Sequence, residues 1–196
     1  MPTSIRLVTA PLVLLLCALS FSKPSQAADN ADYAATLSTA GDVKSQLRSH
    51  FFSAARSGRT DMLQEFIAAG YDLNTRDGKG YTALILAAYN GRPETVELLI
   101  KNGADACAED HRGNTALMGA IFKGELLIAR TLLNTDCNPD QRNAAGQTPA
   151  MYAALFGRVE LLEQLKNKGA DLRATDVDGN SAESLARGEI KTRAMR

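Results

Sequence analysis

The chain is 196 residues long, with 22 Lys and Arg balanced by 22 Asp and Glu and a formal net charge of zero. This length suits one domain with a short extension and can bury a sizeable core. The basic residues form neither a cluster nor a stripe, and no segment resembles a basic amphipathic helix. We therefore expect no nucleic-acid partner and no binding to a membrane surface.

Residues 1–27 have the layout of a secretory signal peptide. Arg6 gives a positive start, residues 7–21 form an apolar run, and Ser25-Gln26-Ala27 offers the small residues of a cleavage site. The apolar run is shorter than the roughly 20 residues that span a bilayer. We therefore expect export with cleavage after Ala27; retention as an uncleaved anchor and lipoprotein processing at Cys17 are the alternatives.

Residues 28–44 are rich in Ala, Ser and Thr, and we expect them to form a flexible or weakly helical N-terminal lead. Beyond residue 45 the sequence repeats itself with a step of 33 residues, as from Gly80 to Gly113. Self-similarity at a fixed step of this length is the signature of a repeat array. Three glycine series keep the step: Gly80, Gly113, Gly146 and Gly179; Gly58, Gly91, Gly124 and Gly157; and Gly70, Gly103 and Gly169, with Asp136 where a further glycine is due.

The motifs within the step are those of a known family. Thr82-Ala83-Leu84 and Thr148-Pro149 stand where ankyrin repeats carry Thr-Pro-Leu-His, and Gly103-Ala104-Asp105 closes the unit as those repeats do. The chain therefore resembles an ankyrin-repeat protein over about 45–188. The resemblance implies an all-α repeat solenoid of 33-residue repeats, each with a helix-turn-helix and a β-hairpin-like loop. It predicts about four repeats at 45–76, 77–109, 110–142 and 143–175, a half-repeat cap at 176–188 and a C-terminal tail at 189–196.

Local signals place the elements inside each repeat. Asp77-Gly78-Lys79-Gly80 predicts a tight turn, and Thr82 predicts a helix N-cap. Pro93 fits the first turn of a second helix, where its missing N–H costs little. The segment 134–139 has lost the closing Gly-Ala-Asp motif, so we expect a distorted loop there.

The sequence shows no catalytic constellation. Its two histidines, His50 and His111, are far apart in an elongated array, and no paired carboxylates, Ser-His-Asp order or phosphate loop occurs. We therefore expect that the protein is not an enzyme and that it holds no cofactor and no metal.

Two cysteines, Cys107 and Cys137, remain after removal of the signal. They fall on the same loop side of adjacent repeats, which stack roughly 10 Å apart, whereas a disulfide needs Cβ atoms about 3.8 Å apart. A bridge therefore requires segment 134–139 to bend towards Cys107. A disulfide, two small buried thiols, and a redox or metal role all remain open.

The resemblance implies that a partner binds to the hairpin tips and to the exposed face of the first helices. One helix position, two residues before the turn glycine, holds Tyr89, Phe122 and Leu155 and suggests a hydrophobic groove. The alternative is that these side chains pack between repeats. The candidate partner-binding residues are Lys79, Tyr81, Tyr89, Asn90, His111, Arg112, Asn114, Phe122, Lys123, Gln147, Leu155 and Phe156.

We therefore expect a monomeric, non-catalytic scaffold or adaptor that binds another protein. The short signal on such an array indicates a bacterial periplasmic location. Exported bacterial proteins that resemble it are often linked with catalase and peroxide defence, which implies support of an oxidative-stress enzyme. The alternative function is that of a redox- or metal-responsive protein using Cys107 and Cys137.

Overall fold

The structure is a computed structural model that describes the backbone of residues 26–192 and the side chains of residues 42–192. Residues 1–25, and with them nearly all of the predicted signal peptide, lie outside the described part, as do residues 193–196. The chain divides into two units, residues 1–42 and 43–196. The described helices are α1 (Gln26–Ser57), α2 (Thr60–Ala68), α3 (Ala83–Tyr89), α4 (Pro93–Lys101), α5 (Ala116–Lys123), α6 (Leu126–Leu133), α7 (Pro149–Leu155), α8 (Val159–Asn167) and α9 (Ala182–Ala186).

Helix α1 covers both the expected lead and the start of the expected first repeat, since it begins at Gln26 and ends at Ser57. The predicted boundary between residues 44 and 45 therefore falls inside a helix. None of the described helices combines the length and the apolar composition that a membrane crossing requires.

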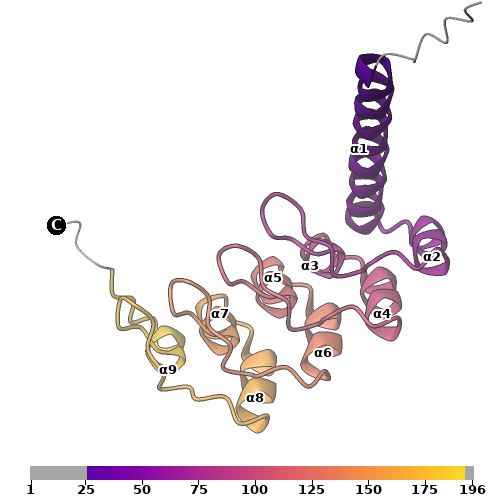
Figure 1. Cartoon of the computed structure of the whole chain (residues 1–196). Helices are drawn as coiled ribbons and strands as arrows, with labels where there is room; N and C mark the ends of the chain where they lie inside the picture. Colours follow the sequence, from indigo (N-terminus) through magenta and orange to yellow (C-terminus); the bar gives the residue numbers. More distant parts are fainter. Residues whose placement is uncertain (1–25, 193–196) are drawn as a thin grey trace, which may run out of the picture. The chain divides into compact units, whose positions relative to one another are not determined.

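In residues 43–196 the helices follow one another as pairs, α3 with α4, α5 with α6, and α7 with α8. The first helices pack side by side, α3 on α5, α5 on α7 and α7 on α9, while α4, α6 and α8 form a second row (Figure 1). Among residues 26–192 there is no strand, and isolated antiparallel bridges join Glu109 to Thr115 and Thr175 to Ser181. The predicted α-repeat solenoid is therefore confirmed.

Each first helix begins at a hydroxyl residue that the repeat places in the same position. The Oγ1 atoms of Thr82, Thr115 and Thr148 each accept a hydrogen bond of 3.3 Å from the backbone N–H three residues later. Ser181 does the same at the start of α9. Pro93 is the first residue of α4. The predicted N-cap at Thr82 and the predicted place of Pro93 are both confirmed.

The buried apolar side chains of successive helix pairs form one continuous core. A fully buried alanine recurs in the first helices, at Ala87, Ala120 and Ala153. A buried leucine recurs in the second helices, at Leu99, Leu132 and Leu165. Burying each large aliphatic side chain contributes about 1.5–3 kcal/mol. Because the small alanines let neighbouring helices approach, this burial is shared between successive repeats.

An acidic or amide side chain holds each loop that precedes a first helix. The Oδ1 atom of Asp77 accepts hydrogen bonds of 2.8 and 3.0 Å from the backbone N–H groups of Lys79 and Tyr81. The same arrangement recurs at Asp110, Asn143 and Asp176. Neighbouring loops are joined through the backbone, first by the His111 N–H, which donates to the Lys79 carbonyl at 3.1 Å. Two equivalent bonds of 2.8 and 3.0 Å join the following loops.

Cys107 and Cys137 are joined by a disulfide, with 5.4 Å between their Cα atoms. Of the arrangements that the sequence left open, the structure contains this one. The Thr135 hydroxyl donates to the sulfur of Cys137 at 3.3 Å, and Gln141 Nε2 donates to the Cys107 carbonyl at 3.0 Å. The loop that lacks its closing glycine is thus tied to the preceding repeat.

Helix α9 and the residues after it close the array. The side chains of Ser181 and Ser184 each accept a hydrogen bond from the other residue's backbone N–H, which forms a capping box. The Lys191 N–H donates to Asn180 Oδ1 at 2.6 Å, and Asn180 Nδ2 donates to the Lys191 carbonyl at 3.0 Å. The first residues of the predicted tail, 189–196, therefore return to the last loop.

Gly80→Ala should destabilise the protein more than Gly70→Ala. Both glycines have positive φ angles, 82° and 70°, which cost a residue with a Cβ about 1–2 kcal/mol. At Gly80 the new Cβ would also lie 2.6 Å from the backbone nitrogen of His111, whereas at Gly70 it would meet nothing within 4 Å. We expect Gly80→Ala to cost roughly 1–3 kcal/mol more in urea unfolding. Equal losses would mean that the contact between loops does not constrain stability.

Removing the disulfide should lower the free energy of unfolding. The bridge joins residues with a sequence separation of 30, and in the chain-entropy model a crosslink of that span contributes roughly 3–4 kcal/mol. We expect the Cys107→Ser/Cys137→Ser variant to lose about that amount in urea unfolding. Dithiothreitol should destabilise the wild type and leave the variant unchanged. A wild type equally stable with and without reductant would contradict a bridge in the folded protein.

Candidate functional site

Large apolar side chains reach solvent at one position of three successive first helices. Tyr89, Phe122 and Leu155 are 42%, 44% and 42% exposed. The ring centroids of Tyr89 and Phe122 lie 6.1 Å apart in a stacked arrangement, and those of Phe122 and Phe156 lie 5.2 Å apart, edge to face. We call Tyr89, Phe122 and Phe156 the aromatic row. Its rings contact one another, and Tyr89 and Phe122 keep much of their surface open.

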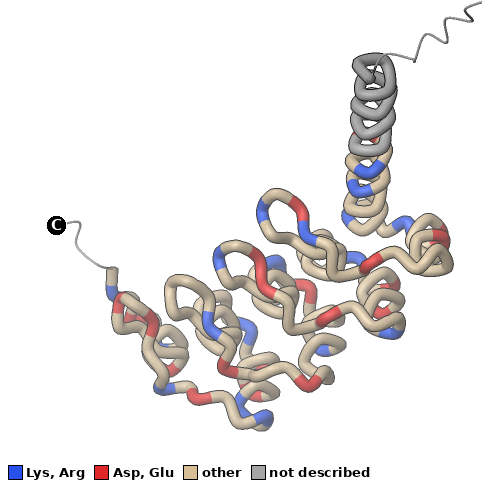
Figure 2. Tube along the Cα trace, in the orientation of Figure 1, with Lys and Arg blue, Asp and Glu red and all other residues tan. Residues whose placement is uncertain are grey.

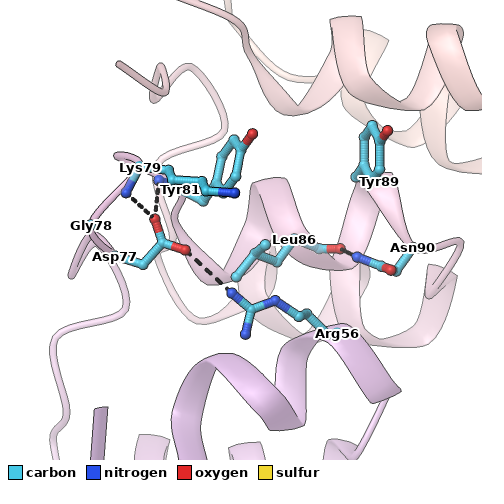
Figure 3. A pocket seen from close by; sticks show the side chains of 8 residues that line it. All are labelled: Arg56, Asp77, Gly78, Lys79, Tyr81, Leu86, Tyr89 and Asn90. Atoms are coloured by element: carbon cyan, nitrogen blue, oxygen red, sulfur yellow. Dashed lines mark hydrogen bonds and ion pairs between the residues drawn. The ribbon is translucent and has the colours of Figure 1, made fainter. Parts of the chain in front are cut away.

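A first hollow, of about 580 Å³, adjoins this row beside the loop that precedes α3 (Figure 3). Arg56, near the end of α1, lines it, and its Nη2 lies 3.2 Å from Asp77 Oδ2. Lys79 and Tyr81 line it from the loop, and Tyr89 lines it from α3. Asp77 Oδ1 also accepts the hydrogen bonds from the loop backbone, so both carboxylate oxygens of Asp77 have partners within the protein.

A second hollow, of about 260 Å³, shares Tyr81 and Tyr89 with the first. The rest of its lining comes from Ile85 of α3, from the next loop and from α5 and α7, and includes Arg112, Phe122 and Tyr152. The two hollows and the aromatic row adjoin one another through these shared residues. We call this combined surface the groove.

Hydrogen-bonded side chains lie beside the second hollow. Asn143 Nδ2 donates to Asn114 Oδ1 at 3.0 Å and to Gln147 Oε1 at 3.1 Å, and lies 3.2 Å from the Tyr152 hydroxyl. The Asn114 amide donates to both carboxylate oxygens of Asp110, at 3.3 and 3.1 Å. Burial raises the pKa of the Tyr152 hydroxyl; the negative charge of Asp110 raises it further, and the bond from Asn143 opposes the shift. The network holds these polar groups in fixed positions.

The accessible charge around the groove is positive. Lys79, Arg112 and Lys123 are exposed, and none forms an ion pair within residues 42–192. The Nζ of Lys123 lies 5.1 Å from the centroid of the Tyr89 ring, a cation–π distance. Lys or Arg colours the ends of the loops before α3 and α5, whereas the loop before α7 ends in uncharged residues (Figure 2). The positive charge is therefore concentrated at the first two loops.

The structure brings most of the predicted partner residues together. Those that line a hollow are Lys79, Tyr81, Tyr89, Asn90, Arg112, Asn114 and Phe122. Those that contact a lining residue or the polar network are Lys123, Gln147 and Phe156. His111 and Leu155 are exposed but line neither hollow.

Sequence reasoning missed several lining residues, among them Arg56, Gly119 and Tyr152. Comparison of positions one repeat step apart could have found them. Arg56 stands one repeat step before Tyr89, and Tyr152 stands one step after Gly119. Gly119 and Tyr152 lie one helical turn before Phe122 and Leu155, on a part of the helix that the prediction did not include.

The groove offers aromatic faces, apolar hollows and cations, which are the features of a binding surface. His50 lies on α1 and His111 on the loop before α5. Within the described residues, no three His, Cys, Asp or Glu side chains are grouped so that they could hold a metal ion. Cys107 and Cys137 are engaged in the disulfide.

Comparison with known proteins identifies the family to which the repeats belong. A family model described as ankyrin repeats (3 copies) matches residues 51–143 and residues 108–176. Together these matches cover well over half of the chain and contain both hollows and the aromatic row. No curated protein matches the chain.

The Tyr152 hydroxyl should ionise above the ordinary tyrosine pKa of 10.0. The folded protein then holds this proton more tightly than the unfolded chain does, so stability should fall as pH rises from about 10 towards the raised pKa. The measurement is the Cζ chemical shift of Tyr152 against pH, assigned with Tyr152→Phe. Asp110→Asn should lower the midpoint, and asparagine is tolerated at this loop position because Asn143 already occupies it one step later. A midpoint at or below 10 would contradict the burial of this hydroxyl.

Proposed function

The chain belongs to the ankyrin-repeat family, and from this premise we propose that it is a non-catalytic scaffold that binds another protein through the groove. Ankyrin repeats are in general protein-interaction modules rather than catalysts. The observation that carries the proposal is the aromatic row, because Tyr89 and Phe122 remain exposed side by side. Contiguous exposed apolar surface commonly marks an interaction site, and aromatic anchors dominate the energy of many interfaces.

We further propose that the protein acts as a monomer in the bacterial periplasm, after cleavage of the signal peptide behind Ala27. The layout of residues 1–27 supports export. The disulfide between Cys107 and Cys137 also supports it, because structural disulfides persist in oxidising compartments and are rare in the cytosol. The partner class that the family resemblance implies there is an oxidative-stress enzyme such as a catalase.

A redox-responsive role is the second candidate function, and the disulfide is the observation that favours it. The two candidates differ in what reduction does to partner binding. In a responsive protein, opening the bridge between Cys107 and Cys137 changes the affinity for the partner. In a scaffold the bridge contributes to stability alone, so affinity is unchanged under conditions in which both forms are folded.

The triple variant Tyr89→Ala/Phe122→Ala/Phe156→Ala should lose partner binding and remain folded. Removing half-exposed rings costs less stability than emptying a buried core position, whereas loss of several aromatic anchors should weaken binding by about 100-fold or more. The measurement is capture from periplasmic extract by immobilised wild type and variant, with and without peroxide stress. The captured protein is then titrated against both, and urea unfolding checks the variant's fold.

The matched control is Leu127→Ala/Val159→Ala. These apolar side chains of the second helices are 59% and 70% exposed, so the control removes exposed apolar surface from outside the groove. It should bind like the wild type. If the folded triple variant captures the same protein with unchanged affinity, the groove is not the binding surface.

A further inference from the structure

The second hollow lies where α5 carries a glycine and the neighbouring first helices carry a large side chain. Leu86 stands one repeat step earlier and Tyr152 one step later, whereas α5 has Gly119. Glycine is the poorest helix former after proline, and it weakens a helix interior. A glycine at this position therefore works against the stability of α5.

Neither the backbone nor the packing requires this glycine. Gly119 lies inside α5, and its φ is not in the left-handed region that favours glycine. A Cβ built on it would meet only side-chain atoms of Tyr89, at 3.7 and 3.9 Å, which are ordinary contact distances. The packing around α5 therefore leaves room for a side chain at position 119. In its absence, Gly119 lines the second hollow.

The hollow has the size and the walls of a socket for one side chain. Its volume of about 260 Å³ is below the roughly 300–1,000 Å³ of pockets that enclose a whole small ligand. Rings of Tyr81, Tyr89, Phe122 and Tyr152 line it, together with Met118. Aromatic rings and a methionine favour a large apolar guest, above all an aromatic one.

The charge around the hollow favours acidic residues beside the apolar side chain in the bound segment. Arg112 lines the hollow and is exposed, and the Nζ of Lys123 lies 5.1 Å from the ring centroid of Tyr89 in its wall. The one carboxylate in the lining, Asp110, is only 8% exposed and accepts the backbone N–H groups of Arg112 and Asn114. Carboxylates of a bound segment would therefore meet cations that no described residue pairs with.

We propose that the hollow over Gly119 is an anchor pocket for one large apolar side chain from an acidic segment of the partner protein, and that Gly119 determines this specificity. The inference rests on the proposed function, because it names the partner chemistry that the same groove recognises. One repeat step earlier the first hollow has Leu86 at the corresponding position and the Arg56–Asp77 ion pair in its lining, and one step later Tyr152 occupies this position. The anchor lies among the rings, and the acidic residues beside it face Arg112 and Lys123.

A phage-displayed library of random dodecapeptides, selected on the purified protein, tests the pocket without a known partner. We expect the enriched peptides to share a large apolar residue with Asp or Glu close to it. A consensus peptide should bind roughly 10- to 100-fold more weakly to Gly119→Leu, because the anchor loses its buried site. This variant should unfold no earlier than the wild type, since leucine is the better helix former.

Three further variants complete the test. Gly119→Met fills the pocket with a flexible side chain and should give the same loss, so the result does not depend on how leucine packs. Gly119→Ala leaves most of the hollow open and should keep most of the binding. Arg112→Glu should weaken binding of the acidic peptides and spare a version in which Lys replaces their acidic residues.

The proposal is overturned if no peptide is enriched, if the enriched peptides share no large apolar residue, or if their flanks are basic. Unchanged binding to folded Gly119→Leu also overturns it. If that variant binds normally while the triple alanine variant of the aromatic row does not, the anchor pocket is ruled out and the groove is still the binding surface. If both variants bind normally, binding through the groove is ruled out as well.

Discussion

The structure depends on contact between successive repeats, because the buried side chains of neighbouring helix pairs form one continuous core. Buried alanines let the first helices approach, and leucines of the second helices complete the shared core. A backbone bond, such as that from His111 to the Lys79 carbonyl, sets the spacing of the loops. A stack held together by its nearest neighbours leaves the outer surface of every repeat free to vary, and the groove is built on that surface.

The same interactions make the groove a rigid surface before any partner arrives. Asp77 and its equivalents hold the loops from within, and the amide of Asn143 fixes the polar side chains around Tyr152. What remains accessible is the aromatic row and the cations beside it. Little ordering is then required on binding, so more of the contact energy appears as affinity.

The features that repeat were predictable from the sequence, and the features that occur once were not. The 33-residue step, the N-cap at Thr82 and the place of Pro93 follow from local rules that hold in every unit. The disulfide could not be decided, because stacking alone separates Cys107 and Cys137 by roughly 10 Å, and only the path of their loops brings the Cα atoms to 5.4 Å. The hollow over Gly119 was missed because a lone glycine in a helix indicates only a less stable helix. Whether it also leaves a hollow depends on the side chains that surround it in the fold.

Site-specific photocrosslinking in the host cell tests most directly whether a partner occupies the groove. A benzophenone amino acid replaces Phe122 in one strain and Leu127 in another, since both positions are exposed and apolar but only the first lies in the groove. We expect a crosslinked protein adduct from position 122 and none from position 127. An adduct from position 127 alone, or none from position 122 while the protein is folded, would contradict it.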